Sequence, residues 1–157
     1  MHLSLVNTRG QAGLDAPAVT VEAHLSAGLP AFQVVGLGDN RSREIRSRVR
    51  AALISSHLKW PDFNITVNLT PTEHVSPSTR FDLPIALGLL VASQQLPQDA
   101  IEGREFIGEL GLDGCLKPSR GALEALRRRP GRQHAVSCSG GLSTDGQRRW
   151  QSADRGT

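Results

Sequence analysis

The stretch RFDLPIALGLL, residues 80–90, decides the fold of this chain. After the aspartate nearly every side chain is apolar, which predicts a central helix that is buried on all sides. Pro84 falls in the first turn, where the helix needs no amide hydrogen. Asp82 precedes that turn, and a carboxylate there can accept free amides and complement the helix dipole. We therefore expect Asp82 to be a structural helix cap, and Arg80 to pair with Asp82 or with the end of a strand.

The same helix start also has a catalytic interpretation. A serine in the first turn of a buried helix, with a lysine nearby, would form a Ser–Lys hydrolase site. Here the helix starts with an aspartate, while Ser78 lies in the preceding loop and Lys117 follows later in the chain. A Ser78–Lys117 peptidase dyad is therefore the weakest of the interpretations that stay open.

The residues contain no motif for a nucleotide or a metal. The loop of P-loop ATPases requires the dipeptide Gly-Lys, which does not occur in the 157 residues. Cys115 and Cys138 stand 23 positions apart and lack the paired ligand spacing of a zinc site. We therefore predict no catalytic residue, no metal ligand, no cofactor and no enzyme activity in this chain.

Apolar residues alternate, or recur at helical spacing, on both sides of the central helix. The predicted strands are 2–7, 17–26, 31–37, 63–71, 104–110 and 114–118, and the predicted helices are about 40–56, 83–92 and a short last one at 120–128. The turn AGLP at 27–30 predicts that the strands beside it pair as a hairpin. This order predicts an α+β domain in which a mixed sheet packs against two main helices.

The helix predicted at 40–56 carries many arginines. Arg41, Arg43, Arg46, Arg48 and Arg50 stand on its exposed faces against a single acidic residue, Glu44. A helix that binds phosphates would have this pattern, and Arg41, Arg43, Arg46 and Arg50 are the candidate nucleic-acid contacts. A solvated helix face has the same pattern and is the more common case.

The composition changes near residue 126. Residues 126–157 hold seven arginines and two aspartates, a net charge of +5, whereas residues 1–125 carry −2. The tail has no apolar period, so we predict a domain at 1–125 and a disordered basic tail at 126–157. We expect any weak, sequence-independent DNA binding to be carried mainly by this tail. A shifted reading frame is an alternative origin for it.

The chain has no apolar run of membrane-spanning length and no signal peptide at its start, so we expect a cytoplasmic protein without a membrane partner.

Five stretches together resemble the amino-terminal domain of the Mg-chelatase-like AAA+ ATPases. They are PAVTVEAHLSAGLPAFQVVGL, SRVRAALISS, ITVNLTP, RFDLPIALG and FIGELGLDG, in that order, within residues 1 to about 125. The resemblance implies a Lon-protease-like fold, shared with a domain of a small-subunit ribosomal protein, that precedes an ATPase module using ATP and Mg. It also implies hexameric relatives that act in DNA processing during natural transformation. A true Lon-like protease would keep its serine at the helix start that holds Asp82.

The sequence departs from the family pattern in the loop before Arg80. VSPST at 75–79 replaces a Pro-Lys-Glu-Gly-Gly-like loop, and Gly38 replaces a usual proline. The resemblance ends after Glu124, before any ATPase module. Two hypotheses follow: an amino-terminal, non-ATPase part of such a protein without activity of its own, or an independent module that binds DNA or another protein.

Overall fold

The computed structural model describes residues 2–10, 16–75, 78–117 and the backbone of 134–136. The strands are β1 (His2–Arg9), β2 (Ala18–Ser26), β3 (Ala31–Val34), β4 (Asn64–Thr70), β5 (Glu105–Ile107), β6 (Glu109–Leu110), β7 (Leu116–Lys117) and β8 (His134–Val136). The α-helices are α1 (Gly38–Ser55) and α2 (Asp82–Ala92), and short 3-10 helices cover Thr72–His74, Thr79–Phe81 and Gln98–Ala100. The domain is α+β, as the sequence predicts.

In the part of the chain that the structure describes, six strands form the main sheet in the order β3-β4-β2-β1-β5-β8, and β6 and β7 form a separate antiparallel pair. The sheet is mixed, because β2 pairs antiparallel with both β1 and β4, whereas β3 runs parallel to β4. The predicted hairpin between β2 and β3 is therefore wrong. β4 lies between these two strands. The four-residue turn at 27–30 does not reveal this insertion, because β4 begins thirty residues after the end of β3.

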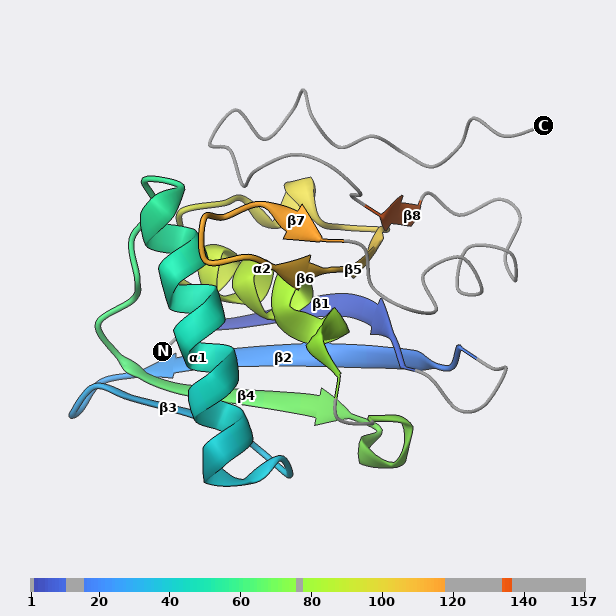
Figure 1. Ribbon diagram of the computed structural model, residues 1–157, viewed down its shortest axis with the longest axis horizontal. Coiled ribbons are helices and arrows are strands. Elements are labelled where there is room, and N and C mark those ends of the chain that lie inside the picture. Colours follow the sequence, from blue (N-terminus) through green and yellow to red (C-terminus); the bar gives the residue numbers. More distant parts are fainter. Residues whose placement is uncertain (1, 11–15, 76–77, 118–133, 137–157) are drawn as a thin grey trace.

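Both α-helices lie on the same face of the sheet (Figure 1). α2 packs over β1 and β2, and α1 lies beside it with its main sheet contact at β3. The buried side chains of β2 and β4 alternate with half-buried ones, so each strand turns one face toward the helices. The core therefore lies between this face of the sheet and the two helices.

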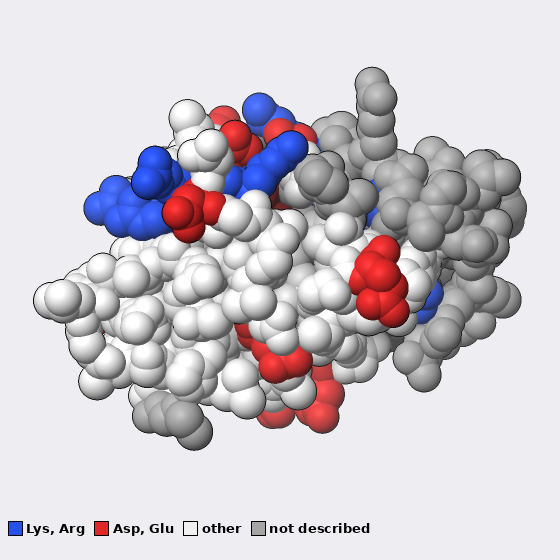
Figure 2. Space-filling model, turned by 90° about the horizontal axis from the view of Figure 1, so that it is seen from below, with Lys and Arg blue, Asp and Glu red and all other residues white. Residues whose placement is uncertain are grey.

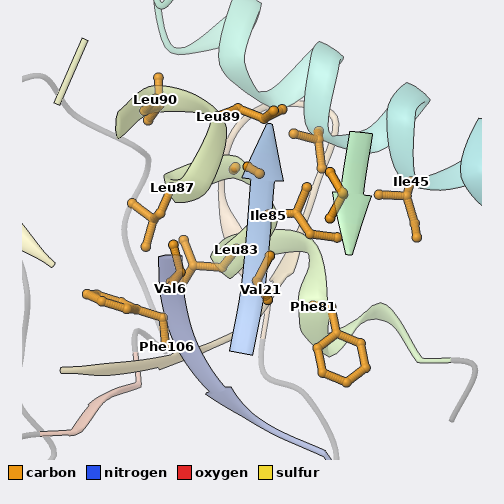
Figure 3. Close-up of a cluster of buried hydrophobic side chains, with 14 of the residues drawn as sticks. Val6, Val21, Ile45, Phe81, Leu83, Ile85, Leu87, Leu89, Leu90 and Phe106 are labelled. Carbon is orange, nitrogen blue, oxygen red and sulfur yellow. The ribbon is translucent and has the colours of Figure 1, made fainter. Parts of the chain in front are cut away.

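The central helix α2 is buried on nearly all sides, as its apolar sequence predicts. Ten of its eleven residues are buried, and Figure 3 shows its leucines directed both toward β1 and β2 and toward α1. At Gly88 the helix approaches the sheet closely, since an added Cβ would lie 3.1 Å from Cβ of Ala23. The hydroxyl of Ser4 donates to the carbonyl of Gly88 over 2.6 Å at the same contact.

The sequence and the structure differ toward the end of the chain. β8 continues the sheet by pairing parallel with β5, so residues 134–136 are not part of a structureless tail. Backbone hydrogen bonds alone can add an edge strand, and they need no side-chain periodicity. The predicted helix at 120–128 and the rest of 126–157 lie outside the described residues.

None of the helices in the described ranges is both long and apolar enough to span a membrane.

Candidate functional site

The start of α2 holds a buried ion pair. The carboxylate of Asp82 is 1% exposed and accepts two hydrogen bonds from the guanidinium of Arg48 on α1, with Nε–Oδ2 at 2.8 Å and Nη2–Oδ1 at 3.1 Å. The backbone amide of Leu110 on β6 donates to the same carboxylate over 3.3 Å. Asp82 therefore joins three elements that are distant in the sequence.

The prediction that Asp82 caps its own helix is wrong. Phe81 occupies the N-cap position of α2, and no side chain there accepts an amide of the first turn. The amide of Leu83 donates instead to the carbonyl of Gly108 over 3.1 Å. Because the backbone satisfies this amide, the carboxylate is free to turn sideways toward α1.

Burial and hydrogen bonding act in opposite directions on Asp82. Removal from water raises the pKa of the Asp82 carboxyl, and this is the largest cause of its shift. The Arg48 guanidinium and the Leu110 amide act to lower the same pKa, and the hydrogen bond to Asp82 raises the pKa of Arg48. The charged form of Asp82 thus depends on Arg48 as its partner.

Arg80 is anchored at the end of a strand, which is one of its two predicted roles. Its guanidinium is buried, and Nη1 donates to the carbonyls of Gly10 and Arg9 over 2.8 and 3.4 Å. The contacts of Asp82 are with Arg48 and Leu110, so the alternative pairing of Arg80 with Asp82 is not the one formed. Arg9, at the end of β1, pairs in turn with Glu105 through two bonds of 2.8 Å.

Neither member of the proposed Ser–Lys dyad contacts the other. The hydroxyl of Ser78 accepts a hydrogen bond from the amide of Arg80 over 3.2 Å, which is a local turn contact. Lys117 is exposed on β7 and pairs across the ladder with Glu109. The carboxylate of Glu109 accepts from the hydroxyl of Thr79 over 2.9 Å. The geometry gives the dyad no support.

The arginines of α1 divide into two groups. Arg48 pairs with Asp82, and Arg41 lies 3.9 Å from Glu44 on the exposed surface. Arg43, Arg46 and Arg50 are exposed and, among the described residues, form no ion pair. They stand at positions i, i+3 and i+7, so they follow one line on the helix surface. We call these three residues the arginine stripe.

The surface around α1 carries most of the visible positive charge in one view of the molecule. Figure 2 shows blue arginine and lysine side chains gathered on the side where α1 lies, with red carboxylates close to them. The remaining described surface in that view is largely white, apart from some carboxylates and a few blue atoms at the opposite end. By their spacing on α1, the predicted candidates Arg43, Arg46 and Arg50 lie on one side of the helix, while Arg41 is partly neutralised by Glu44.

Sequence reasoning missed Trp60, which extends the arginine stripe. The guanidinium carbon of Arg46 lies 5.8 Å from the centroid of the Trp60 ring, within the range of a cation–π contact. The ring of Phe32 on β3 lies 5.7 Å from that of Trp60. An aromatic residue between Lys59 and Pro61 was the available signal, but only the fold brings it to α1.

These observations define a class of protein. It is an α+β domain with a buried ion pair at the start of its central helix and a second, exposed helix that is basic. A family model described as subunit ChlI of Mg-chelatase matches residues 21–137. The chain therefore belongs to the Mg-chelatase-like family. The match reaches beyond the domain boundary predicted at residue 125. The hypothesis that the tail arose from a shifted reading frame stays a prediction.

Three relatives agree with this assignment. The protein YifB of Escherichia coli is 44% identical over 125 residues, which are 80% of this chain and 25% of that protein. Competence protein ComM of Haemophilus influenzae is 44% identical over 126 residues, again 80% and 25% of the two chains. A protein of Mycobacterium tuberculosis is 38% identical over 114 residues, 73% of this chain and 23% of its own length. The chain thus spans about a quarter of the length of these relatives.

Proposed function

We propose that residues 1–125 form the amino-terminal, non-ATPase domain of a ComM-like protein and contribute to DNA processing by holding DNA phosphates. The observation that carries the proposal is the arginine stripe, three exposed guanidinium groups without a carboxylate partner among the described residues. The similarity to a competence protein, together with the DNA-processing role that the family resemblance implies, supports this proposal. The Lon-protease-like fold remains an expectation from the resemblance.

The spacing of the stripe suits a phosphate backbone. Seven residues of α-helix rise by about 10 Å, the distance along the helix from Arg43 to Arg50. One strand of a DNA duplex places a phosphate about every 3.4 Å along its axis. The stripe can therefore lie along about three phosphates. Such contacts hold DNA without reading its sequence.

The start of α2 supports a role without catalysis. The carboxylate of Asp82 is already occupied by Arg48 and Leu110. The hydroxyl of Ser78 accepts from the Arg80 amide, and Lys117 is exposed on β7, where it lies opposite Glu109. A nucleophile needs a base within hydrogen-bonding reach, and among the described residues Ser78 has no hydrogen-bonded base. We therefore propose that the chain hydrolyses neither ATP nor peptides.

The proposal predicts a salt-dependent loss of DNA binding when the stripe is removed. We expect the triple variant Arg43→Ala/Arg46→Ala/Arg50→Ala to bind a fluorescent 20-base-pair duplex about tenfold more weakly at low salt. For this variant, the slope of log affinity against log salt concentration should be smaller in magnitude by up to about 3. Each lost phosphate contact reduces that slope by about 0.9. Fluorescence anisotropy between about 50 and 200 mM salt measures both quantities.

The matched control removes one arginine at a different place. Arg104 precedes β5, which is separated from β3 by three strands of the sheet. Arg104→Ala should change affinity less than Arg46→Ala does, although both remove one positive charge. The arginines of residues 126–157, which the sequence predicts to carry most of any weak DNA binding, are present in every variant, so differences between the variants report on α1 and Arg104 alone. Equal binding by the wild type and the triple variant would show that α1 does not hold DNA.

A further inference from the structure

Three side chains from three separate segments form a stack at Arg46, the middle residue of the arginine stripe. Phe32 belongs to β3, Arg46 to α1, and Trp60 to the connection between α1 and β4. The two rings are tilted by 48° with their centroids 5.7 Å apart, and the Arg46 guanidinium lies over the Trp60 ring. Phe32 and Trp60 are only partly buried, and Arg46 is exposed. The stack therefore reaches from the core to the solvent.

The loop that carries Trp60 is held in place by a side chain. The amide group of Gln95 accepts from the backbone N–H of Lys59 and donates to its carbonyl, both over 2.8 Å. The same amide donates to the hydroxyl of Ser93 over 2.9 Å. Pro61, on the other side of Trp60, is buried. Because these contacts fix the loop before any ligand arrives, binding would require little ordering of Trp60.

We propose that Trp60 and Arg46, supported by Phe32, form a stacking subsite for one unpaired base of a single-stranded nucleic acid. This inference rests on the proposed function, because Arg43 and Arg50 would hold the adjoining phosphates. Bases stack on aromatic rings and on the planes of arginine guanidinium groups. A base in a duplex is covered by its neighbours, so only a single strand can use this subsite.

The subsite predicts that Trp60 affects single strands alone. In a comparison of oligo(dT) of 12 nucleotides with a 12-base-pair duplex, Trp60→Leu should weaken binding of the single strand about tenfold, within the range for one lost base stack. It should leave duplex binding within about twofold. Trp60→Phe, which keeps a ring, should retain most single-strand affinity. Arg50→Ala, which removes a phosphate contact, should weaken binding of both forms.

A second measurement does not depend on how Trp60→Leu folds. The chain has two tryptophans, Trp60 and Trp150, so Trp150→Phe leaves Trp60 as the only one. Oligo(dT) that stacks at the subsite should quench its fluorescence, and the duplex should not.

The possible outcomes separate the two proposals. Binding of neither DNA form would overturn the proposed function and the subsite together. Binding that is equal for both forms, without quenching and unchanged in Trp60→Leu, would leave the arginine stripe standing and overturn the subsite. Quenching of Trp60 by single strands, together with the selective loss in Trp60→Leu, would support the subsite.

Discussion

Arg48→Ala is expected to lower the free energy of unfolding by about 3 kcal/mol at pH 7, since breaking a buried pair leaves an uncompensated charge. The carboxylate of Asp82 is 1% exposed and would lose its only charged partner in the described structure, whereas the Arg48 side chain is 23% exposed. Asp82→Asn should therefore cost less, because a guanidinium left alone can turn toward water. Urea unfolding of both variants measures this asymmetry.

The loss in Arg48→Ala should also depend on pH. Burial raises the pKa of Asp82 above its value in the unfolded chain. An acid with a raised pKa stabilises the folded state through its protonated form. This stability is fully present below the pKa of the unfolded chain and is lost as the pH rises through the pKa of the folded state. Without Arg48 the folded pKa lies higher still. The loss should thus be small near pH 4, about the ordinary pKa of aspartate, and grow toward pH 7 by at most about 1.4 kcal/mol per pH unit.

Arg50→Ala is the matched control for Arg48→Ala. Arg50 is an exposed arginine on the same helix, and a substitution of this kind costs within about 0.5 kcal/mol. Similar small losses in the two variants at every pH would contradict the structural role of the Arg48–Asp82 pair.

Arg80→Met is expected to destabilise the domain by about 2–4 kcal/mol. The guanidinium of Arg80 is buried and donates to the carbonyls of Arg9 and Gly10. Methionine fills most of the volume but leaves these acceptors without their charged donor, and each buried group left unsatisfied costs about 1–3 kcal/mol. Thermal and urea unfolding give the change in free energy.

Two further variants show whether the donor geometry of Arg80 matters. Arg104→Met is the control, because Arg104 is half-buried and, among the described residues, its guanidinium donates only to the carbonyl of Ala100, over 3.4 Å. It should cost much less than Arg80→Met. Arg80→Lys keeps the charge but loses the planar fork, so it should fall between the wild type and Arg80→Met. Equal losses in Arg80→Met and Arg104→Met would show that the contacts at the end of β1 contribute little.

Much of the fold follows from periodicity in the sequence. The alternation of buried residues in β2 and β4, the apolar stripe of α1 and the wholly apolar α2 were each visible as a pattern, and each is found in the structure. These patterns report local geometry, namely which face of an element is buried. They do not report which strand pairs with which, and so the position of β4 between β2 and β3 was missed.

The same limit explains the error at Asp82. A carboxylate before a helix is a good cap by local rules, and nothing near it in the sequence names a competing partner. Arg48 lies 34 residues earlier, and Gly108, whose carbonyl accepts from the Leu83 amide, lies 25 residues later in the chain than Leu83. Only the packing of α1 against α2 shows that Arg48 differs from its four exposed arginine neighbours, Arg41, Arg43, Arg46 and Arg50.

The central claim is that α1, and not the start of α2, is the working surface of this domain. The most direct test is a titration of the ¹⁵N-labelled chain with oligo(dT), followed in proton–nitrogen correlation spectra. We predict that chemical-shift changes concentrate at the backbone amides of residues 43–50 and at the indole N–H of Trp60. The amide signals of Ser78, Asp82 and Leu110 should not move. Shifts concentrated at the start of α2, with residues 43–50 and Trp60 unchanged, would contradict this account.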